Sequence, residues 1–157
     1  MNAEAITGGC QCGAVRYRVG RLGRPTICHC RMCQKAFGGF FAPLVTAHQI
    51  EWTRGAPSHF QSSDKIRRGF CSACGTPLTY EADDGLEIAI GTLDHPALAA
   101  PVAQVNAASR QPFFEDLCSL PQVSDDSRAE NDAWNASLTS FQHPDHETEA
   151  WPPETRP

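Results

Sequence analysis

Cysteine placement constrains this chain of 157 residues most, because seven of its eight cysteines lie in three short clusters. The clusters hold two, three and two cysteines, and they are Cys10 and Cys12, then Cys28, Cys30 and Cys33, and then Cys71 and Cys74. A structural zinc site takes four protein ligands, whereas a catalytic site takes three and keeps one position open. The grouping therefore predicts one closed metal site and one open metal site.

Each cysteine pair is followed directly by a glycine, Gly13 after the first pair and Gly75 after the second. Two thiolates that bind one ion need a sharp turn with backbone N–H groups directed at sulfur, and glycine adopts the positive φ of such a turn without strain. We interpret the two pairs as the halves of one four-cysteine zinc site. The alternative is that all four are reduced cysteines of the core.

The middle cluster is compact enough for a single loop to wrap three sulfurs around one ion. His29 lies between two expected ligands, and we expect it to point away from the ion and to hydrogen-bond elsewhere. Cys118 has no partner at a ligand spacing and is expected to be a packed or free thiol. The site then has an open fourth position, unless a distant residue supplies a fourth ligand and the site is structural.

The charge of such a centre indicates its chemistry. Zinc with three thiolates carries a net charge near −1, which weakens its ability to acidify a bound water. The ion still favours soft ligands, and an incoming thiol can bind as the thiolate. Thiol chemistry is therefore a better prediction for the open site than hydrolysis by a metal-bound water.

The rest of the chain predicts a mainly β fold with little helix. Twelve proline and twelve glycine residues favour turns over long helices. Val15, Tyr17 and Val19 alternate with arginines, as in a half-buried strand. Further strands are expected at 40–46, 48–52, 58–61, 65–70, 77–80, 86–93 and 103–107, with a hairpin around 83–85 and at most one helical turn at 34–37.

The composition changes after about residue 121. Residues 123–157 hold eight acidic and two basic side chains and few aliphatic ones. Such a segment buries too little apolar surface to offset its chain entropy. We therefore expect a zinc-binding domain over residues 1–122 and an acidic, flexible C-terminal tail over residues 123–157, with the tail's scattered aromatic side chains resting on the domain.

Charge and apolar patterning limit the partners and the compartment. Residues 1–80 carry a net charge of +7, from ten basic and three acidic side chains. No stretch is apolar and long enough to cross a membrane, and the N-terminal residues do not resemble a secretory signal. A cytoplasmic location is expected, because clustered cysteines in a reducing compartment are more often metal ligands than disulfides.

Three stretches carry a resemblance to a known family. They are GCQCGAVRY at 9–17, CHCRMCQKAFG at 28–38 and FCSACGTPL at 70–78, with weaker similarity in GTLD at 91–94 and SRQPFF at 109–114. Over about residues 7–122 the chain resembles the glutathione-dependent formaldehyde-activating (GFA) family, also called the CENP-V/GFA domain family. Position 114 is Phe where many relatives are expected to have Trp, and the acidic tail is not part of the pattern.

The resemblance implies a β-rich, Mss4-like fold of small antiparallel sheets with two zinc ions per chain. It implies that Cys10, Cys12, Cys71 and Cys74 hold a structural zinc, and that Cys28, Cys30 and Cys33 hold the catalytic one. It also implies an enzyme that condenses formaldehyde with glutathione to S-(hydroxymethyl)glutathione, which is a carbon–sulfur lyase reaction in reverse.

The basic half of the chain offers cations for the carboxylates of a glutathione-like thiol. The candidates are Arg31, Lys35, Arg67 and Arg68, although ordinary solvated surface charge also accounts for them. No residue is assigned as a general acid or base.

Two rival functions remain. A non-catalytic zinc module could bind a protein or nucleic acid through the basic half, but aromatic side chains are not interleaved with the basic ones, so nucleic acid is a poor prediction. A relative of the methionine-sulfoxide reductases would share the general fold and need a redox cysteine near its centre, but here the spare cysteines are clustered as ligands.

Overall fold

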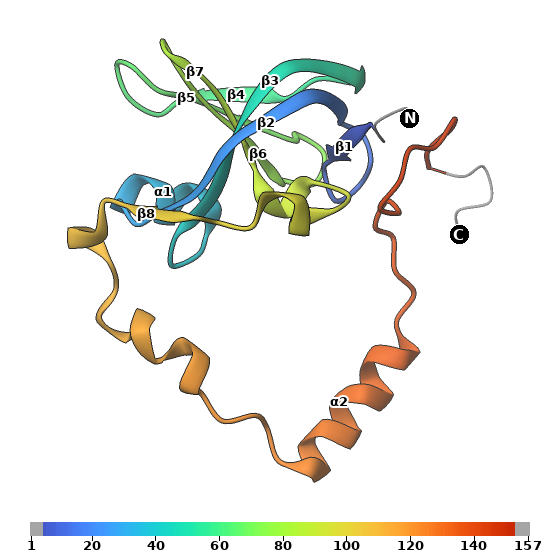
Figure 1. The fold of residues 1–157 in the computed structure, drawn as a ribbon. Helices are drawn as coiled ribbons and strands as arrows, with labels where there is room; N and C mark the ends of the chain where they lie inside the picture. The colour runs from blue at the N-terminus through green and yellow to red at the C-terminus, as the bar shows by residue number, and fades with distance from the viewer. Residues whose placement is uncertain (1–4, 153–157) are drawn as a thin grey trace. The chain divides into compact units, whose positions relative to one another are not determined.

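The computed structural model describes residues 5–152, and their backbone is dominated by antiparallel strands, which confirms the mainly β prediction. The chain divides into two compact units, one formed by the residues up to Arg110 together with those from Gln142 onward, and one formed by Gln111–Phe141. The strands all lie in the first unit (Figure 1). No helix in the described range is long and apolar enough to cross a membrane.

One sheet organises the first unit. Its strands run in the order β1-β2-β3-β7-β6-β5-β4, and β8 pairs in parallel with the end of β2. The strands are β1 Ile6–Gly9, β2 Arg16–Cys28, β3 Ala42–Arg54, β4 Ser58–Gln61, β5 Arg67–Phe70, β6 Pro77–Ala82, β7 Gly85–Ala89 and β8 Ala103–Val105. The long strands β2 and β3 pair with each other along most of their length (Figure 1).

The alternation of side chains along β3 separates two hydrophobic clusters. Val45 and Ala47 belong to the larger cluster, whereas Ala42 and Leu44 pack with Cys28 in the smaller one. Successive residues of a strand point to opposite faces, so one face of this region carries the main core and the other carries the second group of cysteines. The cluster of three cysteines therefore lies on the face opposite the main core.

Several elements differ in extent from their predictions. The stretches expected at 40–46 and 48–52 form one strand, β3, because its pairing with β2 continues through both. The predicted single turn becomes helix α1, Arg31–Phe37, which begins earlier because the Cys30 side chain caps it. The hairpin around 83–85 is confirmed as the connection of β6 and β7, but the strand expected to reach 93 ends at Ala89.

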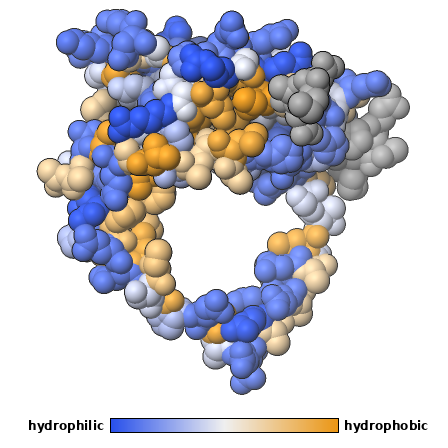
Figure 2. Space-filling view, in the orientation of Figure 1, coloured by the Kyte–Doolittle hydropathy of each residue, from blue (hydrophilic) through white to orange (hydrophobic). Residues whose placement is uncertain are grey.

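The second unit is built from turns and one polar helix. A 3-10 segment spans Pro112–Ser119, and helix α2 spans Asp125–Ser137 with Ser124 as its N-cap. Hydrophilic residues predominate along α2, and none of its residues is buried (Figure 2). The tail expected from residue 123 therefore contains a helix, which the sequence did not signal because α2 lacks the apolar face that marks a packed helix.

Residues from Gln142 to 152 pack within the first unit rather than with α2. The backbone N–H of His143 donates to the carbonyl of Gln11 at 2.8 Å, and the Trp151 indole N–H donates to the carbonyl of Cys12. The sequence-based boundary at residue 122 thus differs from the structural divisions after Arg110 and before Gln142. Composition averaged over the whole segment hid these few specific contacts.

Candidate metal centres and the adjoining cavity

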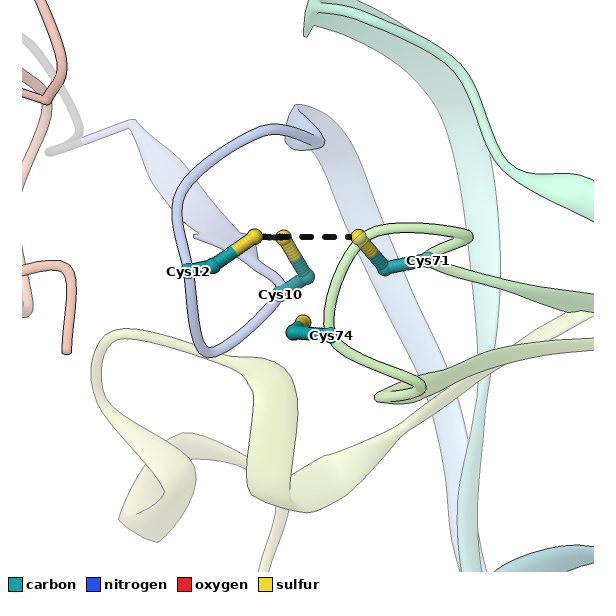
Figure 3. A group of neighbouring side chains, drawn as sticks. All are labelled: Cys10, Cys12, Cys71 and Cys74. Atoms are coloured by element: carbon teal, nitrogen blue, oxygen red, sulfur yellow. Dashed lines mark hydrogen bonds between the residues drawn. The ribbon is translucent and has the colours of Figure 1, made fainter. Parts of the chain in front are cut away.

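The two outer cysteine pairs meet, although about sixty residues separate them in the chain. Their four ligating atoms all lie within 4.8 Å of one another, with Sγ–Sγ distances of 3.6 Å between Cys10 and Cys12 and 3.8 Å between Cys12 and Cys71. A tetrahedral zinc with Zn–S bonds of about 2.3 Å separates its sulfurs by about 3.8 Å. In Figure 3 the four side chains, including Cys74, converge from two facing loops, so the donor set fits a tetrahedral ion.

Glycine shapes both loops as the sequence predicts. Gly13 and Gly75 have φ values of 76° and 78°, in the left-handed region that favours glycine. Their backbone N–H groups donate to the carbonyls of Cys10 at 3.0 Å and Cys71 at 2.8 Å, which closes each turn. At Gly13 an added Cβ would also lie only 2.4 Å from both His143 and Trp151. The C-terminal segment therefore packs directly on the first cysteine loop.

The four thiols of this centre differ in acidity. Burial raises the pKa of Cys10 to about 12. Burial also acts to raise the pKa of Cys74, but hydrogen bonds with the side chain and backbone of Thr76 outweigh it and lower that pKa to about 6. An ion at this centre must displace protons from buried thiols, so metal binding here is coupled to pH.

The middle cluster brings Cys28, Cys30 and Cys33 together with all three sulfurs within 4.8 Å of one another. The end of β2 supplies the first cysteine, the N-cap of α1 the second and the first turn of α1 the third. Among the thiols themselves, the hydrogen bond between Cys33 and Cys28 lowers the pKa of Cys28 to about 5 and raises that of Cys33. Thiols packed this closely can bind one ion together.

Each sulfur of this cluster accepts a hydrogen bond from a different donor. The Asn106 side chain donates to Cys28 at 3.2 Å, and Arg68 donates to Cys33 at 3.4 Å. The backbone N–H of Cys33 donates to the Cys30 sulfur at 3.4 Å. Asn106 has a φ of 55°, a left-handed conformation that asparagine tolerates better than most residues. These donors favour the thiolate form that metal binding requires.

Arg68 is a buried cation beside the sulfurs, with 7% of its surface exposed. Its guanidinium lies over the Tyr80 ring, 5.2 Å from the centroid, and its Nε donates to the Ser62 hydroxyl at 3.1 Å. Its Nη1 group has no hydrogen-bond partner among residues 5–152. A charge held this way offsets part of the negative charge that three thiolates bring to the site.

His29 stays apart from the sulfur cluster, which consists of the three cysteines alone within the described range. The imidazole Nε2 lies 2.9 Å from Oε1 of Gln104 on β8, and the Gln34 side chain donates to the His29 carbonyl at 2.7 Å. The buried imidazole thus ties the cysteine loop to the strand that runs beside β2. Cys118, in the second unit, is an exposed free thiol.

The three sulfurs lie in the wall of an open cavity of about 450 Å³. Polar residues that share its wall include Arg24, Thr46, Tyr80, Glu87 and Asn106. This volume is in the range of pockets that hold small organic ligands. Burial raises the pKa of Glu87, and the charges of Cys28 and Asp84 raise it further. Sequence patterns alone do not indicate these polar residues, because only strand pairing brings them to the cysteines.

The four cations predicted to meet a ligand lie outside the cavity wall. Arg67 forms an ion pair with Glu81 at 2.5 Å, and Arg31 donates to Gln34 at 3.2 Å. Lys35 is exposed on α1. Arg68 contacts a sulfur rather than lining the cavity.

Fold and sites together define a class: a mainly β protein with one four-cysteine and one three-cysteine group, each able to hold a metal ion. The sequence model of the family described as glutathione-dependent formaldehyde-activating enzyme matches residues 5–109, and the chain belongs to this family. A solved structure of a Rhodobacter sphaeroides protein is similar in fold, with a TM-score of 0.51 and 21% identity, covering 63% of this chain and 99% of that one.

Proposed function

We propose that the protein is a zinc-dependent, carbon–sulfur lyase-like enzyme that acts on glutathione and an aldehyde such as formaldehyde. The observation that carries the proposal is the pair of unequal cysteine groups, since four sulfurs converge at one centre and only three at the other, in the wall of a small-molecule cavity. A closed centre is typical of a structural metal and an open one of a metal that meets a ligand. Membership of a family named for an enzyme supports catalysis.

A zinc ion held by Cys28, Cys30 and Cys33 would supply a soft Lewis-acid position that favours the thiolate form of an incoming thiol. The surrounding residues act on that form. Arg68 offsets negative charge next to Cys33, and Asn106 donates to Cys28. Both contacts lower the electrostatic cost of bringing another anionic sulfur to a site that already holds three.

The proposed reaction forms one bond between the thiol sulfur and the carbonyl carbon. The π bond of the aldehyde breaks, its electron pair moves to oxygen, and the proton lost by the thiol is added there, giving an S-(hydroxymethyl) adduct. The reverse reaction breaks the same carbon–sulfur bond. The cavity's contribution is to hold sulfur and carbonyl carbon together, which converts a bimolecular encounter into a local one.

The cations play two separate roles in this proposal. Arg68 acts on the sulfurs, whereas Arg31, Lys35 and Arg67 contribute to the positive potential that attracts the carboxylates of glutathione. Exposed charges act weakly and are screened by salt, so this attraction raises the association rate more than the affinity. A reducing compartment such as the cytoplasm suits a protein that needs seven reduced cysteines.

The test is the rate of adduct formation from glutathione and ¹³C-formaldehyde, followed by NMR with zinc-loaded protein. We expect acceleration over the uncatalysed reaction by the native chain and none by the Cys30→Ser variant. A native protein that gives no acceleration, and that binds oligonucleotide in a salt-dependent way, would favour the non-catalytic module instead.

A further inference from the structure

Glu87 is a carboxylate without a partner on the wall of the cysteine cavity. It is half-buried, and none of the residues in the described range 5–152 forms a hydrogen bond or ion pair with it. Two other acids of the first unit are satisfied, since the buried Asp94 accepts from Arg16 and Thr7, and the partly buried Glu81 accepts from Arg67. A partly buried, unpaired charge is costly, which points to a cationic group that a ligand supplies.

Strand pairing places Glu87 beside two other polar cavity residues. On β7 it lies directly opposite Thr46 of β3 and Tyr80 of β6, and directly opposed residues project to the same face. On the other side of Thr46 the register of β2 shifts between Leu22 and Pro25, which leaves Gly23 and Arg24 together beside that position. Arg24, Thr46 and Glu87 therefore lie in a row across three strands, and all three line the cavity.

The charges of the row complement those of an α-amino acid. An amino-acid head carries a carboxylate and an ammonium group on one carbon, and Arg24 and Glu87 offer the opposite charges on either side of a hydroxyl. Arg24 is exposed and forms no ion pair within the part of the chain that the structure describes. Both charges are thus free for a zwitterion.

The spacing between this row and the sulfurs selects the length of the ligand. Cys28 pairs with Ala42, four residues before Thr46 on β3, which corresponds to about 13 Å along the strand. A ligand that contacts both the row and the sulfurs must therefore carry its head several bonds away from its thiol. Free cysteine carries its amino-acid head too close to its thiol to reach both points, whereas a γ-glutamyl thiol carries it a side chain and a peptide bond away.

We propose that Arg24, Thr46 and Glu87 bind the α-amino-acid head of a γ-glutamyl thiol, with Arg24 on its carboxylate and Glu87 on its ammonium group. This assignment rests on the proposed function, because the thiol end of the same ligand must reach the Cys28, Cys30 and Cys33 site. Arg24, Thr46 and Glu87, called the head row below, would then determine which thiol is bound, and the surface cations would not.

The test compares two ligands on three proteins loaded with Co²⁺. The ligands are glutathione and its des-amino analogue, glutaryl-cysteinylglycine, which lacks only the ammonium group. The proteins are the native chain, Glu87→Gln, and the matched control Glu51→Gln, whose carboxylate is 69% exposed. Calorimetry gives the affinities, and the thiolate–cobalt absorption band reports binding through sulfur.

We expect the native chain and Glu51→Gln to bind glutathione at least about tenfold more tightly than the des-amino analogue, because a charged hydrogen bond is lost. In Glu87→Gln this preference should fall to near onefold. A preference that survives in Glu87→Gln, or that is absent from the native chain, would overturn the head-row assignment.

A simple thiol distinguishes a failure of the proposed function from a failure of the head-row assignment. 2-Mercaptoethanol has no amino-acid head, so its cobalt–sulfur band should appear with the same affinity in all three proteins. If neither it nor glutathione produces the band, the proposed function fails and the head-row assignment fails with it. If the band appears but the ligand preference does not depend on Glu87, the head-row assignment alone is wrong.

Discussion

Arg68 shows how a single residue can tune a cluster of like charges. It lies buried between the Tyr80 ring and the Cys33 sulfur, so its charge acts at short range and with little screening. From the sequence alone, Arg68 is one of four cations predicted to bind a ligand. In the structure it contacts instead the sulfur of Cys33, one of the three cysteines that could hold a metal ion.

Arg68→Met should therefore weaken metal binding at the three-cysteine site by about tenfold or more, since a charged hydrogen bond contributes about 1.5–3 kcal/mol. Arg68→Lys keeps the charge and should lose less. Competition with a chelator measures both affinities, and the four-cysteine site serves as the internal reference. Equal loss at both sites would indicate general unfolding instead of a local effect.

Glu87, unlike Arg68, lies where its charged form is disfavoured. Burial raises its pKa above the ordinary value of 4.5. A raised carboxyl pKa means that the folded state disfavours the charged form, so Glu87 costs stability above its folded pKa and costs nothing once pH falls below 4.5. Glu87→Gln should thus raise the melting temperature at pH 7 by about 2–4 °C. The gain should shrink as pH falls toward 4.5. A lower melting temperature at pH 7 would show that an unidentified contact stabilises the carboxylate.

At the scale of elements, the segment from Gln142 to 152 contributes to the four-cysteine centre. His143 is 7% exposed and packs edge-on against Trp151, with ring centroids 5.0 Å apart. Arg54 donates to the carbonyl of Thr148, and Arg16 pairs with Glu147 at 2.8 Å. The segment therefore packs against the turn that contains Cys12.

Two tryptophans provide a matched test of this contact. Trp151→Ala should lower the melting temperature, since it removes a partly buried ring and its hydrogen bond to the Cys12 carbonyl, a loss of about 1–3 kcal/mol. Trp134→Ala, on the exposed face of α2, should leave it unchanged. Thermal melts that give the two variants the same value would mean that the segment adds nothing to stability.

The two candidate metal centres join elements over different distances in the chain. The four-cysteine group connects the loop after β1 to the loop after β5, whereas the three-cysteine group spans only the end of β2 and the start of helix α1. Cys74→Ser should therefore lower the melting temperature more than Cys30→Ser, because it opens the longer loop closure. If Cys30→Ser is the more damaging change, the structural and catalytic roles of the two centres are reversed.

For the molecule as a whole, short-range patterns carried most of the correct predictions. The glycine after each pair predicted the turns at Gly13 and Gly75, and cysteine spacing predicted the two groups that could each hold a metal ion. Pairing between strands that are distant in the chain could not be inferred, so the approach of Glu87 and Arg24 to the cysteines was missed. The contact of Trp151 with the domain was expected, but the membership of the segment from Gln142 to 152 in the first unit was not, because it depends on specific contacts within an otherwise polar segment.

The proposed function requires the chain to hold two metal ions at unlike centres, of which one admits a thiol. ¹¹³Cd NMR of the cadmium-substituted protein tests it directly, because the cadmium shift responds to the number of bound sulfurs. We predict two signals, of which glutathione moves one and leaves the other in place, while S-methylglutathione moves neither because it cannot bind as a thiolate. A single signal, or two signals that glutathione leaves unmoved, would contradict the account.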